Sequence, residues 1–319
     1  MVWPLPPIEE RPLRLGTSMC LLGAPVRYNA QAKECRLITR GLKERVDWIA
    51  VCPEMGIGMG TPRPTIRIVV GENGEDRLVE PDSGRDHTDA MRAWAEEKAE
   101  ELAAENLHGF VLAKGSPSCG MERIKVYKDG GPSHRSRDGF FVETLRARLP
   151  WLPLEEDGRL NDPHLQAHFF GRVRAVRRLR LLFEDGDWKR GAVVDFHTRE
   201  KFFLLAHSTA LYQELGKLVG AISELPAAEF AERYQDLYLR CIARRPTRGT
   251  HQNVLDHMAG FFKHPLRPAE KEEVREAIEA YRRGEATLAL PARILRFLAT
   301  AYQEDYLLDQ IYFDEALRT

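Results

Sequence analysis

Residues 109–120 read GFVLAKGSPSCG, and this stretch contains the features that decide the predicted fold and site. The apolar run Gly109–Ala113 is typical of a buried strand. The residues after it, Ser116–Gly120, are typical of a loop, because Gly and Pro interrupt regular structure. This loop presents two hydroxyl groups and a thiol close together in the sequence. We therefore predict that it belongs to a functional site.

Two other cysteines occur in the same local setting, each directly after an apolar run. Cys20 follows the run Leu13–Met19, and Cys52 follows Val46–Val51. In open sheets of parallel strands, ligands bind at the carboxyl ends of the strands. If the three runs are strands of one sheet, their cysteines share that edge. The sequence therefore predicts that Cys20, Cys52 and Cys119 lie close together.

The N-terminal half alternates between strand patterns and helix patterns. Strands are predicted at residues 13–19, 46–51, 65–70, 109–113 and 124–127, and helices at residues 32–43, 86–105 and 139–149. Such alternation predicts an α/β fold, a Rossmann-like three-layer domain with helices on both faces of a parallel sheet.

The C-terminal half has almost entirely the 3.6-residue period of helices. Helices are predicted at residues 165–183, 226–244, 253–262, 268–283 and 291–313, and strand-like alternation is absent after about residue 195. A polar stretch punctuated by Pro and Gly separates the two halves near residues 151–162. We therefore predict domains at residues 1–160 and 188–319, the second all-helical, joined by a helical linker at 161–187.

Composition restricts the location and the partners of the protein. The chain has 319 residues, five cysteines and a formal net charge of −1, so charge gives no global reason to expect a nucleic acid or an anionic membrane as partner. The N-terminus has no signal-like apolar region, and no apolar run approaches the roughly 20 residues of a membrane span. We expect a soluble protein in the reducing cytoplasm, where spaced cysteines more often indicate metal binding or catalysis than disulfides.

Three thiolates suit an iron–sulfur cluster better than a zinc ion. A structural zinc site takes four ligands, often including a C-x2-C pair, and the sequence has no such pair. Three cysteines can hold a cubane cluster with one iron left open, and that iron is a Lewis acid for a soft atom such as sulfur. The alternative is that each cysteine is a small buried apolar residue, which is the interpretation we give to Cys35 and Cys241.

Other polar residues near the cysteines are candidates for catalysis and substrate binding. Glu54 lies two residues after Cys52 and is a candidate general base or proton shuttle, or else a surface or capping glutamate. Ser116 and Ser118 are candidates for proton transfer, or else caps of the turn. Arg27 and Arg63, together with Lys114 and Arg123, are basic residues of the same loops that could meet a phosphate or carboxylate, or remain solvated charges.

The helical half offers weaker signals. His197, His207, His251, His257 and His264 are metal ligands by type, but no HExxH motif or i, i+4 histidine pair occurs, so satisfied or exposed histidines are the better interpretation. The run Arg244–Arg248 (RRPTR) is either a phosphate-contact patch or a solvated loop.

The motifs resemble a known family. Ser18-x-Cys20-Leu21-Leu22-Gly23, Val51-Cys52-Pro53-Glu54, Pro62-Arg63-Pro64 and Lys114–Gly120 (KGSPSCG) resemble the DUF523 family, the thiouracil desulfidases known as TudS. Asp195–Gly216 (DFHTREKFFLLAHSTALYQELG) resembles the DUF1722 domain that is often fused to DUF523. The resemblance implies a [4Fe-4S] cluster on Cys20, Cys52 and Cys119, with Glu54 and a serine of the Ser-Pro-Ser loop as acid/base candidates.

The expected activity follows from this resemblance. It implies non-redox hydrolytic removal of sulfur from thiolated uracil compounds such as 2- or 4-thiouracil and 4-thiouridine monophosphate, with release of sulfide. The substrate class is a small thiolated nucleobase or nucleotide, with Arg27 and Arg63 as substrate-binding candidates. The alternative is an iron–sulfur RNA-binding or redox-sensing protein that acts on thiolated tRNA through the helical half, with Arg244, Arg245 and Arg248 as contacts. A third option is that this half mediates homodimer formation or shields the cluster from oxygen.

Overall fold

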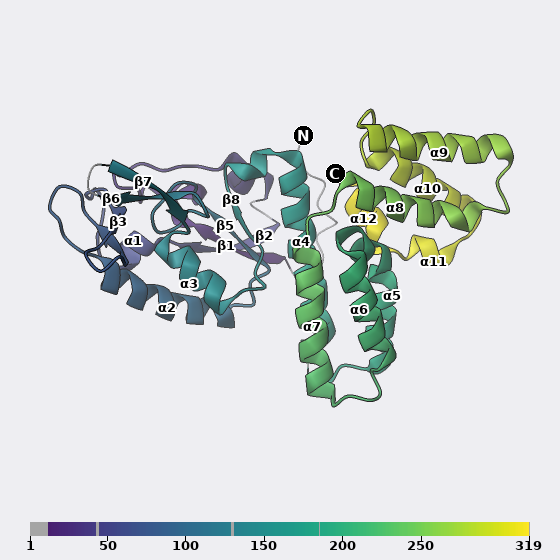
Figure 1. Cartoon of the computed structure of the whole chain (residues 1–319), viewed down its shortest axis with the longest axis horizontal. Helices are drawn as coiled ribbons and strands as arrows, with labels where there is room; N and C mark the ends of the chain where they lie inside the picture. Colours follow the sequence, from purple (N-terminus) through teal and green to yellow (C-terminus); the bar gives the residue numbers. More distant parts are fainter. Residues whose placement is uncertain (1–11, 43–44, 129–130, 185, 319) are drawn as a thin grey trace. The chain divides into compact units, whose positions relative to one another are not determined.

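The computed structural model of the chain describes residues 12–42, 45–128, 131–184 and 186–318. It divides into two compact units, Met1–Phe169 and Phe170–Thr319, and each unit is described by itself. The first unit contains the strands and the second is helical (Figure 1). This arrangement confirms the predicted fold class of an α/β domain followed by an all-α region. The domain limits at residues 160 and 188 stay a prediction.

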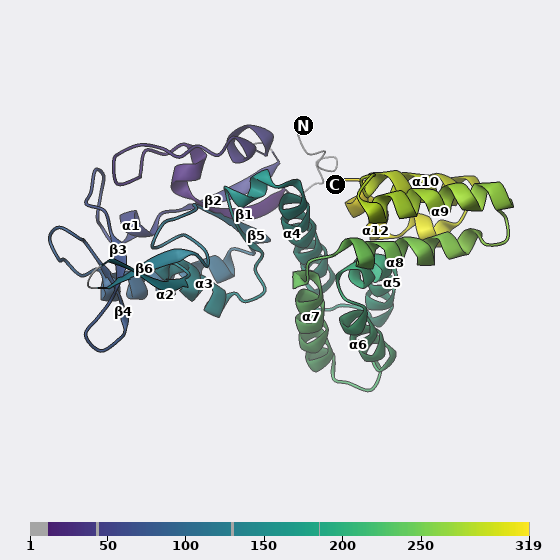
Figure 2. The same cartoon turned by 45° about the horizontal axis from the view of Figure 1, so that its top comes forward.

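A parallel four-stranded sheet forms the centre of the first unit. Its strands are β1 (Leu13–Ser18), β2 (Val46–Val51), β5 (Gly109–Leu112) and β8 (Leu154–Glu156), in the spatial order β2-β1-β5-β8. Ser18 lies opposite Val51 in the β1–β2 register, and Thr17 lies opposite Val111 in the β1–β5 register. The carboxyl ends of β2, β1 and β5 therefore lie next to one another, as Figure 2 lets the reader follow.

Helices pack against one face of this sheet through a common apolar core. The helices are α2 (Thr88–Ala104) and α3 (Phe140–Arg148), and the short α1 (Pro53–Gly56) also contacts α2. Phe110 of β5 lies at the centre, with its ring centroid 5.9 Å from that of Phe141. Gly16 of β1 leaves room for this ring, because a Cβ at that position would lie 2.1 Å from a Phe110 ring atom. Packing at this position thus requires glycine in β1.

A second, mixed sheet was not predicted, although two of its strands were. Its strands are β3 (Arg67–Val70), β4 (Asp76–Val79), β6 (Ile124–Lys128) and β7 (Gly131–Arg137), in the order β4-β3-β6-β7. β3 and β6 run parallel, and the two outer strands pair antiparallel. The sequence predicted β3 and β6 but not β4, β7 or β8. These three strands are largely polar, so they lack the apolar pattern from which strands are predicted. They form because neighbouring strands pair with them.

The helix predicted at residues 32–43 is wrong over the residues that the structure describes. A single π-helical turn, Leu37–Gly41, occupies that region, and residue 43 lies outside the described residues. The reason is a competing set of backbone hydrogen bonds. Lys33 N donates to Cys20 O at 3.0 Å and Cys35 N donates to Leu21 O at 2.9 Å, so this segment pairs with the turn after β1.

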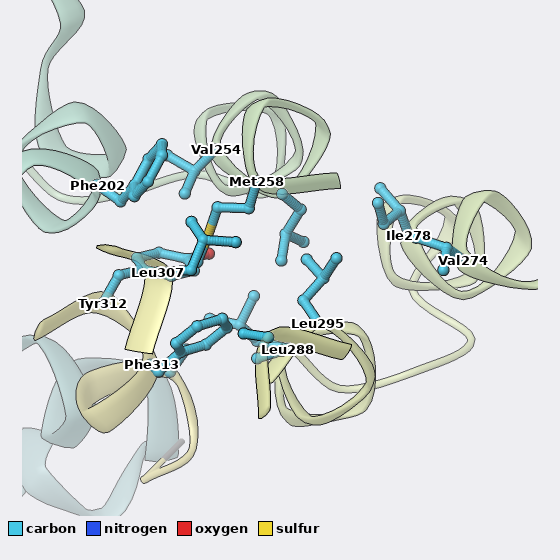
Figure 3. Close-up of a cluster of buried hydrophobic side chains, with 14 of the residues drawn as sticks. Phe202, Val254, Met258, Val274, Ile278, Leu288, Leu295, Leu307, Tyr312 and Phe313 are labelled. Atoms are coloured by element: carbon cyan, nitrogen blue, oxygen red, sulfur yellow. The ribbon is translucent and has the colours of Figure 1, made fainter. Parts of the chain in front are cut away.

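The second unit is built from helices. They are α4 (Pro163–Phe183), within which the division between the units falls, α5 (Arg190–His207), α6 (Thr209–Gly220), α7 (Ala227–Ala243), α8 (Arg248–Ala259), α9 (Pro268–Arg283), α10 (Ala289–Ala301), α11 (Asp305–Leu308) and α12 (Ile311–Ala316). One of the unit's apolar clusters gathers side chains from α5 and from α8 to α12. Figure 3 shows side chains of this cluster, including Phe202, Met258, Leu295 and Phe313, directed toward one another. None of the helices in the described ranges is both long and apolar enough to cross a membrane.

The single helix predicted at residues 291–313 is divided into three. α10 ends at Ala301, and Gln303 then adopts a left-handed conformation with φ of 55°. Two short helices follow and bring Leu307 and Phe313 into the core beside Leu295 (Figure 3). The sequence has a continuous helical period here, but dividing the helix buries these side chains, and their burial decides the structure.

Candidate functional site

The three predicted cluster cysteines lie at the carboxyl ends of three adjacent strands. Cys20 is in the 3₁₀ turn Met19–Leu22 directly after β1, and Cys52 is the N-cap of α1 directly after β2. Cys119 follows β5 in the Ser-Pro-Ser loop and is 4% exposed. All three are free thiols. Topology alone explains this placement, since parallel strands that neighbour one another end at one edge of the sheet.

Glu54 is the electrostatic neighbour that the three thiols share. Burial raises the pKa of the Cys119 thiol well above its usual range, and the Glu54 carboxylate raises it further. Burial, followed by Glu54, raises the pKa of Cys52 to about 11, and the same two causes raise the pKa of Cys20. Cys52 Sγ lies 3.5 Å from Glu54 Oε2. Glu54 thus acts on all three thiols in the same direction, and it lies within 3.5 Å of the Cys52 thiol.

Both serines of the loop point at the same carboxylate. Ser118 Oγ donates to Glu54 Oε1 at 2.7 Å, and Ser116 Oγ lies 3.2 Å from that oxygen. The two hydroxyls also contact each other at 2.8 Å. Ser116 Oγ accepts from the backbone N–H groups of Ser118 and Cys119, both at 3.2 Å. Ser116 thus caps the turn as well as taking part in the polar cluster, so both interpretations offered by the sequence apply to it.

Two neighbours of the site were not assigned from the sequence. The Ser18 hydroxyl lies beside Cys119 and also accepts from Ala113 N at 3.0 Å. Asp157, just after β8, accepts from Lys33 Nζ at 3.0 Å and from Lys114 N at 2.8 Å. Ser18 opens the Ser-x-Cys motif at Cys20, a signal that could have identified it. Asp157 stands in a polar stretch with no such signal.

The two predicted substrate-binding arginines have different surroundings. The guanidinium of Arg27 lies 5.6 Å from the ring centroid of Tyr28, which is 45% exposed. The side chain of Arg63 is 6% exposed, and its guanidinium is bound to the protein itself. Their assignment to substrate stays a prediction.

The donor set fits an iron–sulfur cluster better than a single metal ion. Within the part of the chain that the structure describes, no three His, Cys, Asp or Glu side chains converge on a point where one ion could sit. A cubane cluster does not need that convergence, because each cysteine binds a different iron. A cationic cluster would also favour the thiolate forms that burial and Glu54 disfavour. The residues present therefore fit the group that the sequence motifs imply.

The candidate residues of the helical unit are engaged within it or exposed. His197 Nδ1 lies 3.2 Å from the Tyr234 hydroxyl, and burial lowers the pKa of His197 to about 4. His207 Nδ1 contacts Arg244 O at 2.6 Å, and His251 Nδ1 contacts the Tyr312 hydroxyl at 3.0 Å. His257 and His264 are exposed.

In the predicted RNA-contact run, Arg248 Nη1 donates to Tyr281 O at 2.7 Å. Arg244 and Arg245 are exposed. The RNA hypothesis stays a prediction.

The fold and the site together define a class of protein. It is an α/β protein with a cysteine-lined polar site at the carboxyl edge of a parallel sheet, followed by an all-helical unit. The model of a family described as 2-thiouracil desulfurase matches residues 15–157, and that of DUF1722, a protein of unknown function, matches residues 201–316. The chain belongs to the 2-thiouracil desulfurase family in its N-terminal part and to the DUF1722 family in its C-terminal part.

Two relatives accompany these matches. The chain is 31% identical over 144 residues to the uncharacterized protein YbgA of Escherichia coli (strain K12), a match that covers 45% of this chain and 85% of YbgA. It is also similar to a protein of solved structure described as the [4Fe-4S]-dependent thiouracil desulfidase TudS. That match has 30% sequence identity and a TM-score of 0.38, and it covers 48% of this chain and 95% of the other.

Proposed function

We propose that the protein is a [4Fe-4S]-dependent desulfidase that replaces the sulfur of thiolated uracil compounds by oxygen without a redox step. The observation that carries the proposal is the carboxylate of Glu54: it lies 3.5 Å from Cys52 Sγ, accepts from Ser118 Oγ at 2.7 Å, and raises the pKa of the Cys20, Cys52 and Cys119 thiols. Membership of the 2-thiouracil desulfurase family supports the same reaction class.

The residues have separate roles in this proposal. Cys20, Cys52 and Cys119 hold the cluster, which supplies a Lewis-acid iron for the substrate sulfur when bound. Glu54 accepts a proton from the water that attacks the thiocarbonyl carbon, and the hydroxyls of Ser116 and Ser118 hold that carboxylate in place.

The proposed reaction is balanced without an oxidant or a reductant. Water adds to the carbon of the C=S group, the C–S bond breaks, and the two protons of water leave with sulfur as hydrogen sulfide. The serine pair, 2.8 Å apart, offers a path for a proton from Glu54 to the ring or to the leaving sulfur. The product is the corresponding oxo compound. Free thiouracil, its nucleotide and thiolated RNA all contain the reacting group.

The test is anaerobic reconstitution followed by an assay for released sulfide. Iron and acid-labile sulfide should each reach about four per chain, the content of a cubane. The reconstituted protein should release sulfide from 2-thiouracil, 4-thiouracil or 4-thiouridine monophosphate. Full activity of metal-free protein, or no sulfide release by fully reconstituted protein from any of the three, would overturn the proposal.

A further inference from the structure

Arg63 is buried in the site although it lies in an exposed loop. Its side chain is 6% exposed, whereas the neighbouring Pro62 and Pro64 are exposed. Nη1 donates to Val26 O at 2.8 Å and to Gly60 O at 2.9 Å. A buried arginine that donates to two backbone carbonyls is held by the protein, and these donors are not offered to a ligand.

The same side chain reaches the carboxylate at the centre of the site. Arg63 Nη2 lies 3.7 Å from Glu54 Oε2, the carboxylate oxygen nearer to Cys52. The other oxygen, Oε1, accepts from Ser118 and contacts Ser116. Glu54 is thus fixed from two sides, by a cation at one oxygen and by hydroxyls at the other. A carboxylate held in this way has little freedom to rotate.

The backbone around Arg63 completes the connection between two loops. Arg63 N donates to Tyr28 O at 2.8 Å, and its guanidinium donates to Val26 O, so the segment after Cys20 is bound at two points. Gly60, the other acceptor, has a φ of +71°, a conformation that glycine adopts without strain. The loop that contains Gly60 also folds back on α1, since Met59 N donates to Glu54 O at 3.1 Å.

We propose that Arg63 is a positioning residue, which holds the Glu54 carboxylate and fastens the loop after Cys20 to the loop after α1. This inference rests on the proposed function for its catalytic part. It differs from direct substrate binding, in which the guanidinium would leave its carbonyl partners to meet an anionic group of the ligand. Positioning predicts a lower kcat for every substrate, whereas direct binding predicts a raised KM only for a substrate with an anionic group.

The kinetic experiment uses the reconstituted full chain with 4-thiouracil, which has no phosphate or carboxylate, and with 4-thiouridine monophosphate, which has a phosphate. Arg63→Met should retain its iron and lower kcat by about 100-fold, because a misplacement of about 1 Å of a catalytic group has that effect, while KM changes by less than about 3-fold. Arg63→Lys should be intermediate, since lysine retains the charge without the planar fork. Arg67→Met, which removes an exposed arginine of β3, is the matched control and should match the wild type.

A second readout needs no cluster and no activity. In the metal-free protein, amide hydrogen exchange at Gly58 and Met59 should be at least about 10-fold faster in Arg63→Met and Arg63→Lys than in the wild type or the Arg67→Met control. If reconstituted wild type releases no sulfide, the proposed function fails, and exchange still decides whether the arginine fastens the loops. If Arg63→Met does not fold, Arg63→Lys provides both readouts. A raised KM for 4-thiouridine monophosphate with an unchanged kcat, an unchanged kcat on 4-thiouracil, or unchanged exchange would overturn the positioning role.

Discussion

Both units of the chain bury carboxylates, but they surround them differently. In the helical unit, Arg178 Nε lies 2.5 Å from Glu200 Oε1, and Arg178 Nη1 lies 3.2 Å from Glu315 Oε1. Arg174 Nε donates to both oxygens of Glu315, at 2.9 and 3.0 Å. Two buried acids thus meet two arginines at short range, and the opposite charges hold the pKa of the Glu315 carboxyl below its usual range despite burial.

In the α/β unit, the buried carboxylate of Glu54 is less compensated than these two. Glu54 has one arginine, at 3.7 Å, and its nearer partners are hydroxyls and thiols. Burial and Glu54 both raise the pKa of the Cys20, Cys52 and Cys119 thiols. A matched set of buried charges indicates a structural role. A carboxylate whose nearest partners are hydroxyls and a thiol instead indicates a candidate functional site.

Among the substitutions that test this comparison, Cys119→Ala should have the largest effect. Loss of one of three thiol ligands should remove the cluster, so iron content and sulfide release should both fall to background after reconstitution. Cys241→Ala is the matched control, because this buried thiol of α7 contacts the Leu204 and Ser208 carbonyls rather than Glu54. Iron bound stoichiometrically by the Cys119 variant, or lost from the Cys241 variant, would contradict the assignment.

Glu54→Gln separates catalysis from cluster binding. Glutamine preserves the size of the side chain and can still accept from Ser118, but it does not accept a proton from water. We expect kcat to fall by about 100- to 10,000-fold, the usual contribution of a general base, with iron content unchanged. Glu34→Gln, on an exposed side chain, serves as control. A wild-type kcat in the Glu54→Gln variant would exclude Glu54 as the base.

The sequence predicted the three strands that precede the cysteines, β1, β2 and β5, but not the fourth strand of the same sheet, β8. The apolar runs before Cys20, Cys52 and the Cys119 loop were sufficient to predict β1, β2 and β5 and to place the three cysteines at their carboxyl ends. Buried strands leave such runs in the sequence because most of their side chains are apolar. β8 has no such pattern, since its Leu-Glu-Glu sequence depends on pairing with β5.

The site itself was predictable in its residues but not in its contacts. Glu54, Ser116 and Ser118 were chosen by proximity to cysteines, and the structure brings all three together. The burial of Arg63 was not predictable, because it depends on carbonyls of Val26 and Gly60 that are distant or irregular in the sequence. Tertiary hydrogen bonds of this kind leave no local pattern.

Arg178→Met tests the structural side of the comparison. It should lower the free energy of unfolding of the helical unit by about 3–5 kcal/mol, because Glu200 would be left buried without its cation. Hydrogen exchange of the slowest α5 amides measures this change. Arg233→Met is the control, since the Arg233–Glu229 pair is exposed and contributes roughly 0–1 kcal/mol. Equal effects of the two substitutions would show that the buried network does not stabilise the unit.

His197 should give the helical unit a smaller, pH-dependent loss of stability. Burial lowers the pKa of His197 from 6.5 to about 4, so between these values the unfolded chain binds a proton that the folded unit does not. Stability is therefore fully present above pH 6.5 and falls as the pH is lowered toward 4, by about 3 kcal/mol in total.

The measurement that checks this effect is the pH dependence of exchange-derived stability in the helical unit. His197→Gln should flatten the slope between pH 6.5 and 4, because glutamine does not titrate there, whereas His257→Gln, at an exposed position, should leave it unchanged. An unchanged slope in the His197 variant would mean that acid destabilises this unit by another route. One such route is protonation of Glu315. Because the pKa of this carboxyl is lowered in the folded unit, its contribution to stability is lost at more acidic pH than that of His197. The pH at which stability is lost therefore distinguishes protonation of the buried neutral His197 from protonation of Glu315 in its buried ion pair.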